Sequence, residues 1–263
     1  MENWRLFELN CVDYLNNIFS NHILKFLGTG QSDSTTSDIV ALKNGQVLFN
    51  IECKMPDAQS GQFVLFQQNN QFVFSAGNKT EENEFTDLII SYMNDNFEYY
   101  KNVTTKSMSI NLPPTVFENW IKGHYINKGV KFIITSERNG NHIIFPISEY
   151  GKYFEIKADF RIKTSGSSHL SRSYENTVIN LFKLNYGPCS IEWDGKKAYL
   201  VTSLILSEKI KMADDNHRYQ LNKDGNKYLV KMLSNTHNAN VIFRINLQKN
   251  QSENDLNCFK EFL

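Results

Sequence analysis

Two carboxylates and a lysine flank a predicted β-hairpin in the stretch SDIVALKNGQVLFNIECK, residues 37–54. Alternate side chains of a β-strand share one face, so Glu52 and Lys54 both point to the same side of the second strand. Carboxylate oxygens are the ligands that Mg²⁺ prefers, and an ammonium group can stabilise the charge that develops on a phosphate under attack. If Asp38 joins them on that face, the three side chains suit metal-assisted hydrolysis of a phosphodiester.

Asp38 reaches that face in only one of two hairpin registers. Asn44-Gly45 is a strong signal for a tight turn between the two strands. A two-residue loop would pair Asp38 with Ile51 and turn its carboxylate away from Glu52. A three-residue loop shifts the pairing by one residue and sets Asp38 opposite Glu52, so we expect this bulged form. The motif is short, and taken alone it more often marks an exposed strand end with an ordinary ion pair.

Several further residues near the hairpin could take part. Ser37 comes directly before Asp38, and the backbone carbonyl of Cys53 could serve as another metal ligand. Gln62 follows the E-x-K element, where its amide could contact a phosphate or a water molecule near the metal. Glu8, on the first predicted helix, is expected to face solvent.

Hydrophobic periodicity predicts the elements that must position these side chains. Helices are expected over residues 3–19, 84–100, 114–128 and 174–185. Strands are expected on both sides of the turn at 44–45 and over 64–66, 71–76, 130–136, 142–148, 153–163, 190–195, 197–206, 227–233 and 239–247, with a turn over 55–63. The order of helices, hairpin and strands indicates an α/β or α+β fold with mixed sheets.

The composition is typical of a globular protein in a reducing compartment. The chain has 263 residues, of which 41% are hydrophobic and 13% aromatic, enough for a packed core in one large domain or in two to three small ones. The scattered cysteines form no C-x-x-C pair, which favours free thiols over disulfides or a zinc site. No apolar stretch approaches the roughly 20 residues of a membrane span, and the segment MENWRLFELN lacks the features of a signal peptide. We therefore expect a cytoplasmic protein with no membrane contact.

The formal net charge is zero, but the charges are unevenly distributed along the chain. Residues 1–100 contain 5 Lys/Arg and 13 Asp/Glu, whereas residues 101–263 contain 23 Lys/Arg and 15 Asp/Glu. An acidic half can hold cations and a basic half can contact phosphates, although chance segregation explains the asymmetry equally well.

Two polar stretches of the basic half contain candidate DNA contacts. The stretch RIKTSGSSHLSR is rich in hydrogen-bond donors, and arginine or lysine can donate to O6 and N7 of guanine in the major groove. The stretch SNTHNAN is rich in asparagine, which also favours turns for backbone reasons. The candidates are Arg161, Lys163, Ser165, Ser168, His169, Arg172, Asn235 and Asn238. On the residues alone, a flexible polar loop is the favoured explanation of the first stretch, and a turn explains the second equally well.

The spacing of Ser37-Asp38 and Glu52-Cys53-Lys54 resembles the core motif of the PD-(D/E)xK nucleases, with serine in place of proline. Longer stretches, in the same order and across nearly the whole chain, resemble the HhaI-like type II restriction endonucleases. These stretches are SDSTTSDI (32–39), IECKMPDAQSGQFVLF (51–66), FENWIK (117–122), RIKTSGSSHL (161–170) and KMLSNTHNANVIF (231–243). The family motif is SD, a spacer and E-A-K; here a cysteine replaces the alanine, and the spacer is longer by two residues.

The resemblance implies a Mg²⁺-dependent enzyme that cuts duplex DNA at GCGC. It implies a monomer with one catalytic site that nicks the strands in turn, and a cytosine methyltransferase as a functional partner without direct contact. Ser37, Asp38, Glu52 and Lys54 would be the catalytic residues.

The resemblance also implies a mixed-sheet nuclease core flanked by helices, with additional small mixed-sheet DNA-binding domains. The expected parts are a catalytic domain over 1–148, a sequence-recognition domain over 149–175 and 225–263, and an accessory domain for nonspecific DNA binding over 176–224. Two other functions stay open at this point: a structure-specific repair nuclease on the same core, and a sequence-specific DNA-binding protein with an inactive site.

Overall fold

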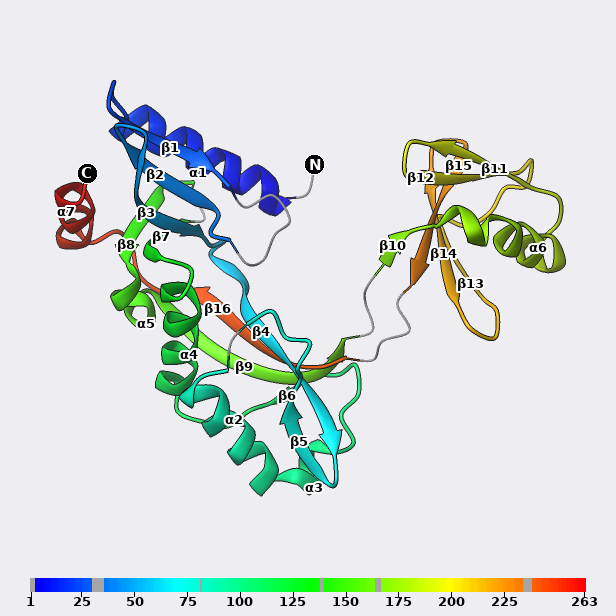
Figure 1. The fold of residues 1–263 in the computed structure, drawn as a ribbon, viewed down its shortest axis with the longest axis horizontal. Coiled ribbons are helices and arrows are strands. Elements are labelled where there is room, and N and C mark those ends of the chain that lie inside the picture. Colours follow the sequence, from blue (N-terminus) through cyan, green and yellow to red (C-terminus); the bar gives the residue numbers. More distant parts are fainter. Residues whose placement is uncertain (1–2, 30–35, 81, 138–139, 164–166, 234–237) are drawn as a thin grey trace. The chain divides into compact units, whose positions relative to one another are not determined.

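The computed structural model describes residues 3–29, 36–80, 82–137, 140–163, 167–233 and 238–263. The chain divides into two compact units, each of which is described here by itself (Figure 1). Unit 1 comprises residues 1–162 and 239–263, and unit 2 comprises residues 163–238. Unit 2 is therefore an insertion between two segments that build unit 1 together.

Unit 1 contains two sheets and the helices that cover them. Sheet 1 has the strand order β1-β2-β3-β7-β8, and sheet 2 has the order β5-β4-β16-β9-β6. The elements are α1 (Asn3–Phe19), β1 (Leu24–Gly28), β2 (Ile39–Lys43), β3 (Gln46–Cys53), β4 (Asp57–Gln68), β5 (Gln71–Phe74), α2 (Glu84–Asp95), α3 (Phe97–Tyr100), β6 (Met108–Ser109), α4 (Pro114–Ile126), β7 (Val130–Ser136), β8 (His142–Pro146), η1 (Ile147–Glu149), α5 (Tyr150–Tyr153), β9 (Phe154–Lys163), β16 (Asn238–Leu247) and α7 (Glu253–Glu261).

Sheet 1 is mixed, because β3 and β7 run parallel while its other neighbouring strands are antiparallel. One face packs against α1 and α7, whose Cys11, Leu15 and Phe259 share a core cluster with the sheet. On the other face, Ile133 and Phe145 belong to the core that also contains α4, α5 and sheet 2. Burial on both faces explains why β7 and β8 are nearly continuous apolar runs rather than alternating ones.

The predicted elements differ from the observed ones mainly at their ends. The segment 55–63, predicted as a turn, is wrong: strand β4 begins at residue 57 and includes most of it. The helix predicted over 84–100 is interrupted at Asn96, which ends α2 and precedes the short α3. Asn83 caps α2 through a capping box with Thr86, so the start of this helix is fixed by local side chains. Strand β1, helix α7 and the strands over 209–213 and 218–224 were not predicted from periodicity.

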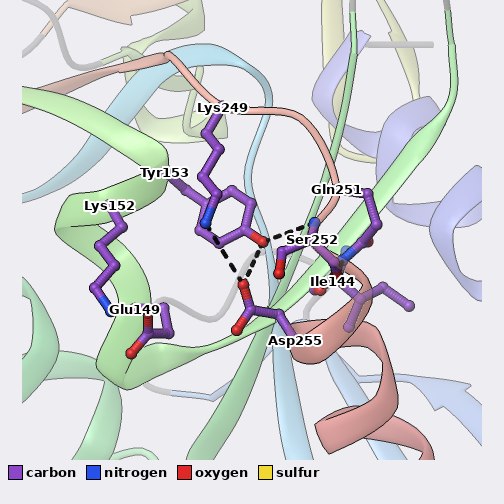
Figure 2. A network of polar contacts seen from close by, with 8 residues as sticks. All are labelled: Ile144, Glu149, Lys152, Tyr153, Lys249, Gln251, Ser252 and Asp255. Carbon is purple, nitrogen blue, oxygen red and sulfur yellow. Dashed lines mark hydrogen bonds and ion pairs between the residues drawn. The ribbon is translucent and has the colours of Figure 1, made fainter.

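Polar contacts tie the C-terminal segment of unit 1 to the edge of sheet 1 (Figure 2). The Gln251 amide accepts a hydrogen bond from the backbone N–H of Ile144 at 2.7 Å and donates one to its carbonyl at 2.9 Å. Tyr153 donates its hydroxyl to Asp255 Oδ2 at 2.5 Å, and Lys249 Nζ lies 3.8 Å from the same carboxylate. The Gln251 side chain thereby makes the hydrogen bonds to the backbone of Ile144 that a neighbouring strand would make at this edge of the sheet.

We expect Gln251→Ala to destabilise the protein by about 1–3 kcal/mol, because it leaves the buried backbone N–H and C=O of Ile144 without these partners. The midpoint of urea unfolding measures the effect. Gln248→Ala is the matched control, since the exposed side chain of Gln248 donates to the carbonyl of Asn246 and to no buried group among the described residues. Equal midpoints for the two variants would contradict this interpretation of the contact.

Unit 2 is built on a sheet with the strand order β11-β12-β15-β14-β13, with β10 paired to β15. Helix α6 packs on one face, where its Val178 and Phe182 join a core with Leu200, Tyr219 and Val230. The elements are β10 (Ser167–His169), η2 (Arg172–Tyr174), α6 (Glu175–Asn185), β11 (Ser190–Asp194), β12 (Lys197–Val201), β13 (Lys209–Ala213), β14 (Arg218–Asp224) and β15 (Lys227–Leu233).

The cysteines Cys11, Cys53, Cys189 and Cys258 are free thiols, as predicted. Within the described ranges, no helix is both long enough and apolar enough to cross a membrane.

Candidate active site

The β2–β3 hairpin has the pairing that brings Asp38 opposite Glu52, but for a different reason than predicted. The turn is a two-residue one, with Asn44 and Gly45 both at positive φ and Lys43 paired with Gln46. The shift of one residue occurs farther along, where Leu42 pairs with Val47 but Ala41 pairs with Phe49. A β-bulge at Leu48, rather than a three-residue loop, therefore sets the face.

The three side chains of the motif line one cavity in unit 1. Asp38, Glu52 and Lys54 share a cavity of about 380 Å³ with Gln59 and Gln62 of β4. Glu52 lies on the face of sheet 1 opposite the α1 core, since it is directly paired with Ile133 of β7 in a parallel ladder. The structure thus brings together on one surface the residues that the sequence placed on both sides of the turn.

Gln59 and Gln62 face the same cavity because of a second bulge. Residues three apart in a regular strand would point to opposite faces. Where β4 pairs with β16, Gln62 lies opposite Ile242 but Gln59 lies opposite Arg244, so one extra residue is accommodated in β4. The Gln59 side chain then donates to Gln62 Oε1 at 2.9 Å. Gln62 therefore lines the same cavity as Asp38, Glu52 and Lys54.

Gly61 makes that bulge possible. It has a φ of +119°, which L side chains rarely adopt, and a Cβ there would lie 2.7 Å from the ring of Trp120. The close approach lets α4 pack on β4, which brings the end of α4 to the cavity.

Asp38 is held by a backbone group in largely buried surroundings. Its Oδ2 accepts a hydrogen bond from the N–H of Cys53 at 2.9 Å. Burial raises the pKa of Asp38 to about 7, with a further contribution from the Glu52 carboxylate, against the opposing effects of Lys54 and the Cys53 N–H. Two carboxylates that face each other in a buried site repel, and a cation between them would relieve this repulsion.

Glu52 and Lys54 form a buried ion pair. Lys54 Nζ lies 2.7 Å from Glu52 Oε1, and the exposed fractions of the two side chains are 13% and 6%. Burial alone would lower the pKa of Lys54, but Glu52, Tyr125 and Asp38 more than offset it and raise the pKa well above its ordinary value. Lys54 is therefore an ammonium at neutral pH.

The carboxylates fit a hard divalent cation. Glu52 Oε2 is buried and has no hydrogen-bond partner in the described part of the chain, which leaves one carboxylate oxygen available. No three Asp, Glu, His or Cys side chains of the described residues are grouped closely enough to hold a metal by themselves. Mg²⁺ needs no such cage, because it is usually bound by one or two carboxylates together with water and substrate phosphate.

The other predicted residues near the hairpin are placed less directly. Ser37 is buried, and its backbone carbonyl accepts from the hydroxyl of Thr29 at 2.7 Å, so the contact found for it is structural. The Cys53 side chain is packed in the core behind the strand. Glu8 is half-buried, whereas we expected it to face solvent. Its pKa is raised by burial, and also by the Glu52 carboxylate, while Lys54 acts in the opposite direction.

The far wall of the cavity contains residues that the sequence patterns did not single out. They come from the segment after β5 and from the end of α4: Asn78, Lys79, Thr80, His124, Tyr125 and Lys128. Burial lowers the pKa of His124 to about 3, with Lys128 and Lys54 acting in the same direction, so this imidazole is neutral. Helical spacing of His124 and Lys128 was the available signal, but the bulge that brings β4 beneath them is not visible in the sequence.

The candidate DNA contacts are spread over both units. Arg161 lies near the end of β9 in unit 1, and its buried Nε has no hydrogen-bond partner in the described part of the chain. Ser168 and His169 are exposed in β10, and the Arg172 guanidinium lies 4.6 Å from the centroid of the Trp193 ring. Within this stretch, residues 161–163 belong to a strand, as predicted, whereas residues 167–169, predicted as part of a polar loop, form a second short strand.

Lys163 ends β9 and Asn238 begins β16. Ser165 and Asn235 lie outside the described residues.

Comparison with solved structures finds a chain of the same fold. The HhaI endonuclease, solved in complex with DNA, matches this chain with a TM-score of 0.83 and 40% sequence identity, and the match covers 99% of each chain. No protein-family profile and no curated protein sequence matches the chain. Identity at this level over nearly the full length of both chains establishes common ancestry, and the mixed-sheet core with flanking helices is the predicted fold class. The chain therefore belongs to the HhaI-like restriction endonucleases.

Proposed function

We propose that the protein is a type II restriction endonuclease that hydrolyses phosphodiester bonds of duplex DNA at a short palindromic site, GCGC, with Mg²⁺ as cofactor. The observation that carries the proposal is the single cavity lined by Asp38, Glu52 and Lys54. The solved complex of the related HhaI endonuclease with DNA supports duplex DNA as the partner.

Within the cavity, each residue has a separate part in the proposed reaction. Asp38 and Glu52 would hold Mg²⁺, which activates a water molecule and polarises the scissile phosphate when it is bound. Lys54, kept charged beside Glu52, orients the attacking water and stabilises negative charge on the phosphate oxygens. The side-chain amide of Gln62 donates to a phosphate oxygen or to a water molecule. Ser37 acts by holding the backbone that carries Asp38.

Plasmid cleavage in Mg²⁺ and in EDTA tests this proposal. Discrete fragments that form only with Mg²⁺ are the expected result. A smear would indicate a structure-specific or repair nuclease on the same core. Binding without cleavage would indicate a DNA-binding protein with an inactive site, and would contradict the proposed function.

We further propose that Arg161, Lys163, Ser168, His169, Arg172 and Asn238, with Ser165 and Asn235, contact DNA. Arginine and lysine side chains supply the donors that a GCGC site requires for guanine O6 and N7. The buried, unpartnered Nε of Arg161 supports a role that is completed by a partner. Residues 149–175 and 225–263 would recognise the DNA sequence. Residues 176–224 would bind DNA without sequence specificity.

Arg161→Ala and Lys163→Ala are each expected to weaken binding to GCGC by about 1–3 kcal/mol more than binding to unrelated duplexes. Competition binding on matched oligonucleotides measures this difference. Lys157→Ala is the control, since Lys157 is an exposed lysine of the same strand that pairs with Glu155 at 2.9 Å. Equal losses on both DNAs would make Arg161 and Lys163 phosphate contacts instead.

The remaining parts of the proposal concern the cellular context. We propose that the enzyme acts as a monomer in the bacterial cytoplasm and nicks the two strands in turn. A cytosine methyltransferase would protect the host DNA without touching the nuclease. Nicked circles that accumulate before linear DNA, at protein concentrations where sedimentation gives a monomer, are the expected observation.

A further inference from the structure

Tyr125 belongs to the wall of the catalytic cavity but to none of the proposed chemical steps. It lies on α4 and is 2% exposed. The centroid of its ring is 5.1 Å from Lys54 Nζ. A cation within about 6 Å of an aromatic ring is attracted by the electron density of the ring face. The carboxylate of Glu52 and the ring of Tyr125 therefore both contact the Lys54 ammonium.

A buried chain of hydroxyl groups fixes the ring from behind. Ser60 Oγ lies 3.2 Å from the hydroxyl oxygen of Tyr125 and 2.5 Å from that of Tyr150. Ser60 and Tyr150 are fully buried. A serine hydroxyl can donate to one partner and accept from the other, so both tyrosines are satisfied through it. The chain links β4, α4 and α5, three elements that are far apart in the sequence.

Ser60 reaches the tyrosines because of the bulge in β4. Gln59 and Gln62 face the cavity on either side of it, while Ser60 turns inward. The same local irregularity thus supplies the polar wall of the cavity and the support of Tyr125.

Lys54 needs a second stabilising contact because the Glu52 carboxylate is also proposed to bind the metal. The Oε2 atom of Glu52 has no hydrogen-bond partner in the described part of the chain, although it is buried. Once a cation engages this carboxylate, its attraction for the lysine ammonium is weaker. The ring of Tyr125 is not a metal ligand, and its hydroxyl lies within hydrogen-bond distance of Ser60. A second ammonium, Lys128 Nζ, lies 5.4 Å from the centroid of the same ring.

We propose that Tyr125 is a positioning residue for Lys54: its ring, supported through Ser60 and Tyr150, keeps the ammonium aimed at the phosphate while the Glu52 carboxylate is shared. The proposal rests on the proposed nuclease function of the cavity. It assigns to Tyr125 no contact with the DNA and no proton transfer.

The test compares variants of Tyr125 and Tyr150, the two tyrosines whose hydroxyl groups contact Ser60. Single-turnover cleavage in Mg²⁺ is expected to slow about 100-fold in Tyr125→Leu and about 10-fold in Tyr125→Phe, since small displacements of a catalytic group cost rate steeply. Tyr150→Phe removes the same hydroxyl contact from Ser60 but leaves Lys54 untouched, and is expected to slow cleavage by less than about threefold. Affinity for DNA, measured with Ca²⁺ in place of Mg²⁺, stays unchanged in all three variants.

A second readout needs neither metal nor cleavage. The rate at which an amine-acylating reagent modifies Lys54, followed by mass spectrometry relative to Lys122, is expected to rise several-fold in both Tyr125 variants and not in Tyr150→Phe. If the wild-type protein cuts no DNA, the proposed function fails, and the labelling still decides whether Tyr125 holds Lys54. Wild-type cleavage or labelling in Tyr125→Leu, which lacks the ring, or an equal loss of rate in Tyr150→Phe, would overturn the positioning role.

Discussion

Lys54→Ala is expected to slow DNA cleavage by about 10³-fold or more while DNA affinity changes by less than about threefold. Lys54 is a buried ammonium within the cavity, held 2.7 Å from Glu52 and kept charged by it. A charge aimed at the reacting phosphate from a site with little water acts mainly on the transition state, so its loss appears in the rate rather than in binding.

Lys122→Ala is the matched control for this prediction. Lys122 is also paired with a carboxylate, Glu118, at 3.1 Å, but it lies outside the residues that line the cavity. Single-turnover rates and binding isotherms on one duplex separate the two effects. A Lys54→Ala enzyme that cuts at the wild-type rate would show that the lysine is only a structural partner of Glu52.

Asp38→Asn is expected to slow cleavage by a similar factor and, at the same time, to stabilise the metal-free protein above pH 7. Burial and the nearby Glu52 carboxylate raise the pKa of Asp38 to about 7, from an ordinary value near 3.8. Asparagine keeps an oxygen that accepts from the Cys53 N–H but carries no charge to repel Glu52.

The sign of the pH effect follows from the raised pKa. Below about pH 4 the carboxyl group is protonated in both the folded and the unfolded protein, and it makes no difference to stability. Between about pH 4 and pH 7 only the unfolded chain loses the proton, so the stability of the wild-type protein falls as the pH rises. Above pH 7 the full penalty is present, and a shift of about three pKa units sets its upper limit at about 4 kcal/mol.

Thermal unfolding from pH 4 to pH 8 measures this difference. The gain of Asp38→Asn over the wild-type protein should be absent near pH 4 and reach about 1–4 kcal/mol at pH 8. Added Mg²⁺ should stabilise the wild-type protein at pH 8 and have little effect on the variant, because the ion binds the charged carboxylate. Asp57→Asn, at an exposed aspartate that begins β4, should show neither effect. An Asp38→Asn protein that is less stable than the wild type at pH 8 would contradict the inference that the ionised Asp38 carboxylate destabilises the folded protein.

The sequence correctly predicted that Asp38 and Glu52 lie opposite each other, but it placed the shift in pairing at the wrong position. The need to place Asp38 opposite Glu52 required a shift of one residue in the pairing, and the structure contains that shift. Turn propensity located it at Asn44-Gly45, whereas the bulge occurs at Leu48. Local sequence signals a turn strongly, but a bulge within a strand depends on the packing of neighbouring strands, which periodicity does not report.

The same limit explains the residues that were missed. Strand β4 contains serine, glycine and glutamine where it bulges, so its composition resembles a turn, as the prediction over 55–63 assumed. The bulge is what brings Gln59 and Gln62 to one surface and Ser60 to Tyr125. The end of α4 reaches the cavity only through this tertiary arrangement. The proposed catalytic motif was predictable because its residues lie close together in the sequence. The opposite wall of the cavity was not, because distant segments build it.

The most direct test is the position of a divalent metal in crystals of the protein with duplex DNA that contains GCGC. Mn²⁺ in place of Mg²⁺ gives an anomalous signal that locates the ion without prior assumptions. We predict one peak within about 2.5 Å of carboxylate oxygens of both Asp38 and Glu52, with Lys54 Nζ in hydrogen-bond contact with the phosphate beside it. A peak elsewhere on the DNA, with these two carboxylates bonded only to the protein, would contradict the assignment of this cavity as the catalytic centre.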